Sequence, residues 1–146
     1  MDHRELILSR LVAVLAAVPG VVLAARNRDG LSDRQRPAIV LLDADETARD
    51  GEPRGRSGPS PQIVDMTPEL YILLGSTPAA VGSELNALRA LVIEAVTTDA
   101  TLLSLTGRNG RIRYDGCATG LARGRTMEGE MGVSFTFSYP FDPNKL

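Results

Sequence analysis

The feature that most restricts the fold of this chain is a stretch near its C-terminus in which large apolar side chains occur at every second position. The large residues are Met131, Val133, Phe135, Phe137, Tyr139 and Phe141, and they alternate with Gly132, Ser134, Thr136, Ser138 and Pro140. A helix would distribute the large side chains around its circumference, whereas a strand gathers them on one face. Burial of each one stabilises a fold by roughly 1.5–3 kcal/mol. The stretch therefore predicts a core strand whose other face is narrow and polar.

Two longer segments have the three- and four-residue spacing of apolar side chains that is typical of helices. The first is Asp2–Val18, for which Asp2 is the predicted N-cap. The second is Thr77–Asp99, for which Thr77 is the predicted N-cap. Its apolar stripe consists of Val81, Leu85, Leu88, Val92 and Ala95. A short third helix is expected at Asp99–Gly107, with the aspartate as its N-cap.

Shorter apolar runs between these helices predict strands. They are Val21–Ala25, Ala38–Ala44, Ile63–Gly75 and Arg111–Arg123. Pro68 has no N–H group, so it marks a bulge, an edge or a break between two strands. The order of the elements indicates an α+β fold. We expect a single domain over residues 1–146, with a largely antiparallel sheet and two main helices packed on one face.

The segment Asp45–Gln62 predicts a long flexible loop. It contains three Pro, three Gly and no large apolar residue, so it cannot bury enough surface to offset the entropy lost on ordering. Loops of this length inside a compact domain are usually functional or disordered. The sequence leaves two interpretations open, an assembly loop that orders against a neighbouring subunit and an inert linker.

Composition gives no global sign of a nucleic-acid or membrane binder. The chain has 146 residues, 43% of them hydrophobic and 23% charged, and its net charge is −2. The apolar run Leu11–Val18 is much too short to span a bilayer, and the N-terminal segment lacks the layout of a signal peptide. We therefore expect a protein that stays in the cytoplasm in which it is made.

Fifteen of the sixteen basic residues are arginines, and many of them lie in predicted loops. Guanidinium groups favour interfaces because they are weakly hydrated and donate forked hydrogen bonds. Together with the polar face of the last strand, they give these candidate assembly-interface residues: Arg26, Arg28, Arg34, Arg49, Arg54, Arg56, Ser134, Thr136 and Ser138. The alternative for the arginines is a solvated surface or a DNA-binding surface, although the near-neutral net charge argues against strong DNA affinity. The three hydroxyl residues are expected to face either solvent or the next subunit.

Catalytic patterns are few in this sequence. The best cluster is Asp43, Asp45 and Glu46, in which two carboxylates on one side of a strand end could hold Mg²⁺ as part of a small metal-dependent enzyme. No further ligand group is evident nearby, so a strand that runs out into a solvated loop is the favoured interpretation. Cys117 has no adjacent base, because the one histidine is His3, and we expect it to be a buried or half-buried inert thiol. The sequence predicts no catalytic residue, no metal site and no cofactor site.

Residues Met66–Gly120, "MTPELYILLGSTPAAVGSELNALRALVIEAVTTDATLLSLTGRNGRIRYDGCATG", followed by the terminal "MGVSFTFSYPFDPNKL", resemble the tail terminator (tail completion) proteins of long-tailed bacteriophages. The shared features are an N-terminal helix, a strand, a variable loop, a Pro-containing strand, an amphipathic helix with "ELNALR", the "DATLLSLTGRNG" turn and a final strand with alternating aromatics. These motifs are architectural, and they cover most of the chain.

The resemblance implies a structural virion protein of the tail and neck, made in the host cytoplasm. Such subunits form a homo-oligomeric ring, usually a hexamer, at the head-proximal end of the tail. The ring stops polymerisation of the tail-tube protein and provides the docking surface for the head and its connector proteins. Phage DNA passes through its lumen without sequence-specific binding, and the family has no catalytic residues to carry over. The nearest alternative is a head-completion or connector subunit of the same neck region.

Overall fold

The C-terminal strand β7 (Met127–Phe141) lies at the centre of a seven-stranded sheet. The computed structural model describes residues 2–49, 61–123 and 127–146. One edge of β7 pairs with β5 along its first half and with β4 along its last residues, while its other edge pairs with β6. The prediction of a core strand is confirmed, because Phe135, Phe137 and Tyr139 are fully buried.

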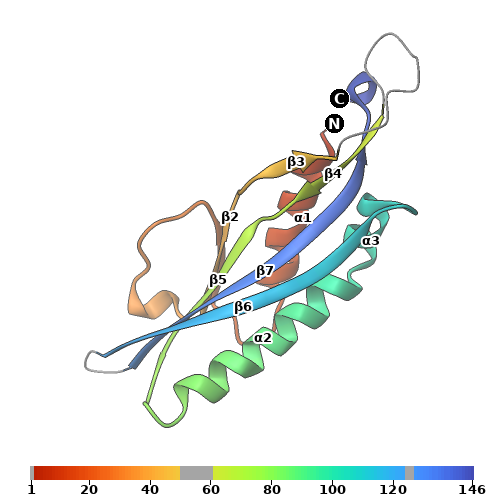
Figure 1. The fold of residues 1–146 in the computed structure, drawn as a ribbon. Helices are drawn as coiled ribbons and strands as arrows, with labels where there is room; N and C mark the ends of the chain where they lie inside the picture. The colour runs from red at the N-terminus through yellow and green to blue at the C-terminus, as the bar shows by residue number, and fades with distance from the viewer. Residues whose placement is uncertain (1, 50–60, 124–126) are drawn as a thin grey trace.

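The remaining strands are arranged around β7 in the order β1-β2-β5-β7-β4-β3 (Figure 1). Their bounds are β1 Leu23–Arg26, β2 Ala38–Leu42, β3 Glu46–Ala48, β4 Gln62–Met66, β5 Glu69–Ser76 and β6 Arg111–Arg123. The strands of the described ranges pair antiparallel, apart from the parallel pair β1–β2. Pro68 separates β4 from β5, as its missing N–H predicts. The fold is the predicted α+β class.

Three helices cover one face of this sheet and bury its apolar side chains (Figure 1). They are α1 His3–Ala16, α2 Val81–Thr98 and α3 Ala100–Thr106. Asp2 caps α1 by accepting the backbone N–H of Arg4 at 3.0 Å, and Asp99 caps α3 by accepting that of Leu102 at 3.0 Å. Both caps are confirmed. Within the described ranges, the structure has no helix with the length and apolar character needed to cross a bilayer.

The start and the apolar stripe of α2 differ slightly from the prediction. Its N-cap is Ala80, whereas Thr77 begins a preceding turn in which its carbonyl oxygen accepts the N–H groups of Ala80 and Val81. The last buried residue of the stripe is Val96, and Ala95 is half-buried. The four-residue spacing from Val92 places Val96, which is larger than Ala95, over the sheet.

The predicted loop at 45–62 begins as a strand. Residues Glu46–Ala48 form β3 and pair antiparallel with β4, with Thr47 opposite Asp65. All three residues of β3 are exposed, so hydrophobic periodicity gives no sign of this edge strand. Residues 50–60 lie outside the described residues, so the predicted flexibility of that part stays a prediction.

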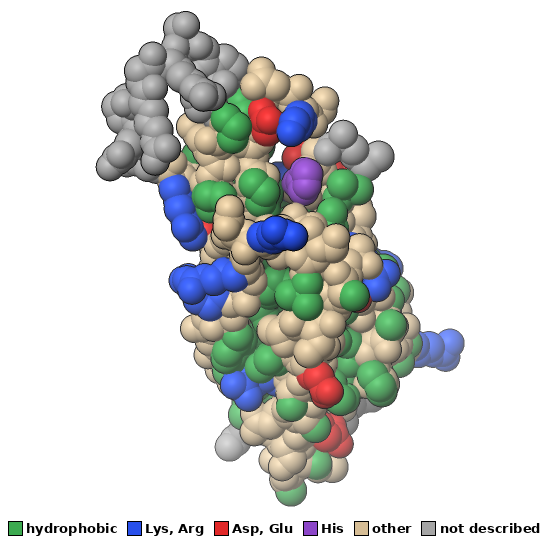
Figure 2. Space-filling view, turned by 90° about the vertical axis from the view of Figure 1, so that its right-hand side faces the viewer, with side chains coloured by type: hydrophobic (Ala, Val, Ile, Leu, Met, Phe, Trp, Pro, Cys, Tyr) green, Lys and Arg blue, Asp and Glu red, His purple; other side chains and the backbone are tan. Residues whose placement is uncertain are grey.

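Apolar side chains that remain exposed are dispersed over the surface. The large ones are Val22, Leu91, Leu103, Leu121 and Leu146. Figure 2 shows the side of the molecule on the right of Figure 1, where hydrophobic side chains form separate groups among polar ones. Single exposed apolar residues of this kind are normal in soluble proteins. Taken singly, these exposed apolar residues therefore do not indicate an interaction surface, and the polar groups of the sheet are the better candidates for one.

Candidate assembly interface

The face of the sheet opposite the helices carries the polar side of β7. Ser134 is exposed there, as predicted for a residue that faces solvent or a neighbour. Thr136 and Ser138 are different, since they are only 5% and 2% exposed within the single subunit. The prediction that these two hydroxyls face solvent or the next subunit is therefore wrong. Arg–Asp pairs from neighbouring strands cover them.

The first of these pairs lies over Ser138. Arg49 follows β3 and donates two hydrogen bonds to the carboxylate of Asp65 on β4, both at 2.9 Å, and a weaker one to Ser138 at 3.3 Å. The hydroxyl of Ser138 donates to Asp65 at 2.5 Å. The Arg49 guanidinium and the Ser138 hydroxyl lower the pKa of the Asp65 carboxyl to about 2. Arg49, a predicted interface residue, is thus hydrogen-bonded to Asp65 and Ser138 of its own subunit.

A second, similar cluster lies over Thr136. Arg113 donates to the carboxylate of Asp115 at 2.5 Å, and the Thr136 hydroxyl donates to the same carboxylate at 2.5 Å. Burial alone would raise the pKa of Asp115, but the hydrogen bonds from Thr136 and Arg113 outweigh it, so the pKa is lowered. The two clusters make this half of the open face polar and internally paired.

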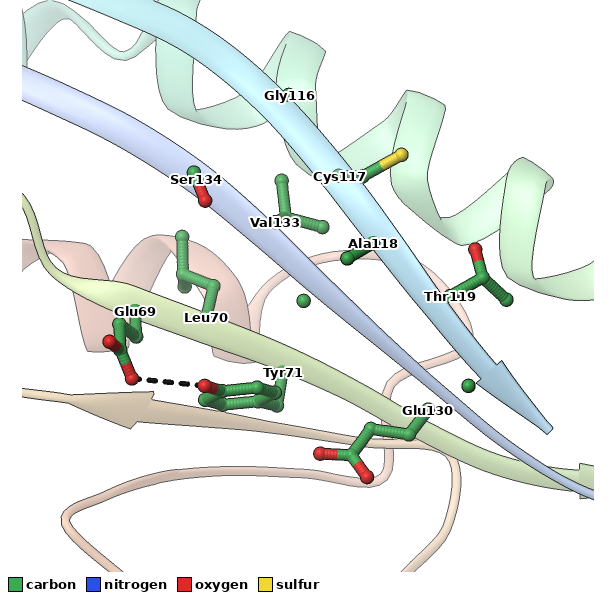
Figure 3. Close-up of a pocket in the computed structure, with 12 residues that line it drawn as sticks. Glu69, Leu70, Tyr71, Gly116, Cys117, Ala118, Thr119, Glu130, Val133 and Ser134 are labelled. Carbon is green, nitrogen blue, oxygen red and sulfur yellow. Dashed lines mark hydrogen bonds between the residues drawn. The ribbon is translucent and has the colours of Figure 1, made fainter. Parts of the chain in front are cut away.

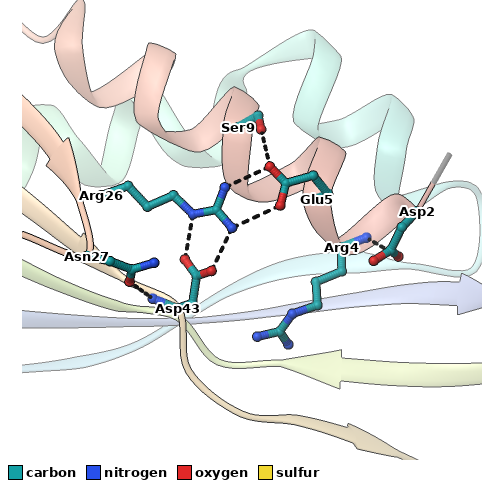
Figure 4. A network of polar contacts seen from close by, with 7 residues as sticks. All are labelled: Asp2, Arg4, Glu5, Ser9, Arg26, Asn27 and Asp43. Carbon is teal, nitrogen blue, oxygen red and sulfur yellow. Dashed lines mark hydrogen bonds and ion pairs between the residues drawn. The ribbon is translucent and has the colours of Figure 1, made fainter.

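Arg26 is used within the subunit to connect α1 to the sheet (Figure 4). Its guanidinium donates to both oxygens of Asp43 at 2.7 and 2.6 Å and to both oxygens of Glu5 at 2.8 and 3.0 Å. The hydrogen bonds to Asp43, followed by those to Glu5, raise the pKa of Arg26, and Arg26 lowers the pKa of Asp43. Arg26, a predicted interface residue, therefore uses its forked hydrogen bonds to stabilise the contact between α1 and the sheet of its own subunit.

The other predicted arginines fall into two groups. Arg28 and Arg34 lie in the segment between β1 and β2, are exposed, and make no ion pair with another residue of the described ranges. They keep their predicted availability to a partner. Arg54 and Arg56 lie outside the described residues.

The acidic cluster after β2 is dispersed among separate partners. Asp43 binds Arg26, whereas Glu46 accepts a hydrogen bond from the hydroxyl of Tyr139. Burial, followed by this hydrogen bond, raises the pKa of Tyr139. Across the described part of the chain, no three His, Cys, Asp or Glu side chains form a group that could hold a metal ion. The geometry therefore gives no support to a metal site built from Asp43, Asp45 and Glu46.

A groove on the open face was not predicted from the sequence (Figure 3). It has a volume of about 530 Å³ and lies across β5, β7 and β6. Its floor is made of small residues, namely Gly116, Ala118, Gly120 and Gly132, and Glu69, Tyr71 and Glu130 also line it. The Tyr71 hydroxyl donates to Glu69 at 2.9 Å, and this bond raises the pKa of Tyr71. The run of small residues in β6 is visible in the sequence. The groove itself depends on the register that places these residues beside β7 and β5, and no local pattern gives that register.

Cys117, in the middle of β6, is exposed, so the prediction of a buried or half-buried thiol is wrong. A bulge between Tyr114 and Gly116 interrupts the register just before it. Tyr114 still packs against Phe135 and receives a hydrogen bond from Arg89 at 3.0 Å. Beyond the bulge, the residues of β6 up to Ala122 are exposed or half-buried, so this half of the strand contributes little to the core.

No protein-family model matches the chain, and no curated protein matches it. Among solved structures, the chain is similar to a chain of "Virion of native gene transfer agent (GTA) particle", with 15% sequence identity and a TM-score of 0.38. The similarity covers 92% of this chain and 90% of that chain. At this TM-score the likeness carries no argument about function.

Proposed function

We propose that this chain is a structural, non-enzymatic virion protein that acts as a ring-forming tail terminator. In this role the ring, a hexamer in the resembling family, caps the tail tube and stops its polymerisation. It then provides the surface on which the head and its connector proteins dock, and DNA passes through its lumen.

One observation carries this proposal. Apart from the variable loop, most of which lies outside the described residues, the elements on which the resemblance rests occur in the expected chain order: α1, the strands around Pro68, α2, α3 and the aromatic strand β7. The order ends with β7 at the centre of the sheet, where the alternating aromatics bind the helices and leave the other face open. In such a subunit, one face of the sheet packs against the helices to form the core, and the polar opposite face is available for contacts with other subunits.

The polar side supports an assembly role through its shape and charge. Its clusters at Thr136 and Ser138 fix the orientation of these side chains, because each hydroxyl donates to a charged carboxylate. The groove beside them has two acidic residues in its lining, Glu69 and Glu130.

The direct experiment is negative-stain imaging of the purified chain mixed with tail tubes from the cognate particle. We expect rings at one end of each tube and none along its wall. Protein found on isolated heads instead would favour a head-completion or connector subunit. Tubes with bare ends, at protein concentrations well above that of the tubes, would contradict both roles.

A further inference from the structure

The long strand β6 leaves one of its edges unpaired. Among the described strands, β6 pairs only with β7, although it spans 13 residues. After its bulge, residues 116–122 read Gly-Cys-Ala-Thr-Gly-Leu-Ala, an uncharged run without Pro. Proteins usually protect such edges with charged residues or Pro, because a free edge pairs readily with another strand. This half of the edge is therefore suited to pair with a strand of another chain.

The first half of β6 is basic on the open face of the sheet. Arg111 and Arg113 lie opposite Ser138 and Thr136 of β7, and residues directly opposite each other on paired strands share a face. Both arginines are exposed. Arg111 makes no ion pair with another residue of the described ranges. The side chain of Arg113, although bonded to Asp115, is still 51% exposed. Both guanidinium groups are therefore accessible to a carboxylate of a partner.

The second half of β6 is acidic on the same face, through its neighbour β7. Gly120 and Ala122 lie opposite Glu130 and Glu128, and both glutamates are exposed. Glu130 makes no ion pair within the described ranges, and the contact of Glu128 with Arg36 is as long as 3.5 Å. Because Gly120 and Ala122 have almost no side chain, an arginine from a strand added at this edge can extend over them. The glutamates lie one strand further on, about 4.8 Å beyond β6.

These two halves are complementary when two β6 strands pair antiparallel. If Cys117 of one copy lies opposite Cys117 of the other, the register of β6 places Arg113 opposite Gly120 and Arg111 opposite Ala122. Each arginine then lies beside one glutamate of the other copy. Because the arrangement is symmetric, every such contact occurs twice.

The bulge in β6 lets both halves match on the same face. Gly120 is three residues from Cys117 and Arg113 is four, so a regular strand would place these two side chains on opposite faces. The extra residue of the bulge between Tyr114 and Gly116 removes this difference. The bulge, which also interrupts the pairing with β7, thus makes the edge of β6 complementary to itself.

On the helix side of the sheet, the same register covers an exposed apolar residue. Leu121 is 55% exposed and lies opposite Gly129, at which an added Cβ atom would meet side chains of α2. Ile112 lies opposite Phe137 and packs against the core. Both side chains therefore face the helices, and the register places Leu121 of one copy opposite Ile112 of the other. The contact joins an apolar pair on one face to charged pairs on the other.

We propose that two copies of this chain form a two-fold dimer by antiparallel pairing of their β6 edges, with Arg111 and Arg113 of each copy against Glu128 and Glu130 of the other. The two-fold axis passes beside Cys117, and the two sheets become one continuous sheet. Such a contact is isologous and closes at two copies. It is therefore distinct from the head-to-tail contact of a ring, and it goes beyond the proposed function.

Oxidative cross-linking tests the register, because Cys117 is the single cysteine of the chain. Residues directly opposite in an antiparallel pair have Cα atoms about 4.5–5.5 Å apart, within the range that a disulfide bridges. Mild oxidation with copper phenanthroline should therefore convert the parent chain to a covalent dimer on a non-reducing gel.

The matched control for cross-linking is Cys117→Ser with Thr119→Cys, which moves the thiol to another exposed position of the same strand. In the proposed dimer the two moved thiols are about 14 Å apart, because each lies two residues from the axis in opposite directions. They should not cross-link. A control that cross-links as fast as the parent chain, or a parent chain that gives no covalent dimer, would overturn the inference.

A charge exchange at the edge provides an independent test. Arg111→Glu and Glu128→Arg should each weaken dimerisation at least tenfold in sedimentation equilibrium, and the chain with both changes should recover it. Arg28→Glu is the matched control, since this exposed arginine also makes no ion pair in the described ranges and lies outside β6. Circular dichroism checks that all variants are folded.

The charge exchange is contradicted by either of two results. One is a doubly changed chain that dimerises as weakly as the single variants, and the other is an Arg28→Glu control that loses as much. Neither experiment involves tail tubes, so the dimer is tested independently of the proposed function.

Discussion

At the scale of single residues, the open face of the sheet depends on arginines and aspartates that pair over small hydroxyl side chains. Ser138 and Asp65 are 73 positions apart in the chain but share a hydrogen bond. Salt bridges on exposed surfaces contribute little stability, about 0–1 kcal/mol, whereas hydrogen bonds from partly buried groups to a charge contribute roughly 1.5–3 kcal/mol. Asp65 belongs to the second kind, because it anchors both a guanidinium and a buried hydroxyl.

Asp65 should therefore make stability depend on acid pH. Its pKa is lowered from 3.8 to about 2 in the folded state, so its contribution is complete above pH 3.8 and is lost as pH falls toward 2. Asp65→Asn should lower the free energy of unfolding at pH 7 and should flatten its decline between pH 4 and pH 2. Urea unfolding over that range measures both effects. Asp33→Asn is the control, since this exposed aspartate makes no ion pair with another residue of the described ranges. Parallel curves for Asp65→Asn and the parent chain would contradict the role of Asp65.

Gly110 lies where two backbone segments approach closely. A Cβ atom there would lie 1.9 Å from the carbonyl oxygen of Thr106 and 2.3 Å from that of Ser138. We expect Gly110→Ala to destabilise the fold by about 3 kcal/mol or more, because backbone atoms must move. Gly82→Ala in α2 meets nothing within 4 Å, and it should stabilise by up to about 1 kcal/mol through helix propensity. Thermal unfolding compares the two, and equal effects would show that the close approach is relieved at little cost.

At the scale of elements, β7 determines how the whole sheet is assembled. It pairs with three other strands and contributes Phe135, Phe137 and Tyr139 to the core. The ring centroids of Phe135 and Phe137 are 6.4 Å apart, a spacing at which aromatic pairs add stability beyond their buried area. Helices and sheet are therefore expected to unfold together.

Truncation within β7 tests this dependence. Phe137→Ala should destabilise the chain by about 3–5 kcal/mol, the usual cost of removing a buried phenyl ring. Ser134→Ala lies on the same strand but on its exposed face, and it should change stability by no more than about 0.5 kcal/mol. Urea denaturation with circular dichroism measures both, and a Phe137→Ala cost below about 1 kcal/mol would contradict a core role for the strand.

Periodic elements could be predicted from the sequence, and contacts between distant elements could not. The alternation in β7 and the stripe of α2 identify the type of each element because each spans many residues. β3 has three exposed residues and no apolar signal, so only its pairing with β4 reveals it. The burial of Thr136 depends on Asp115, which the bulge in β6 places beside it. Cys117 is exposed because β6 pairs only with β7 among the described strands, which no local pattern in the sequence indicates.

At the scale of the whole molecule, helices cover one face of the sheet and the other face is open. Residues 51–60 can be replaced by Asn-Gly, which favours a tight hairpin turn, without removing any residue of β3 or β4. This variant should keep its circular dichroism spectrum and midpoint of thermal unfolding but should not cap tubes. Normal capping would show that the segment is an inert linker.

The central claim, that the chain terminates a tail tube, is tested most directly by tube elongation. Tail tubes are incubated with the purified chain and then supplied with fresh tube protein, and their lengths are measured by electron microscopy. We expect treated tubes to keep their original length, because the ring blocks addition at the end that it covers, while untreated tubes grow. Tubes that grow equally with and without the chain would contradict a terminator role.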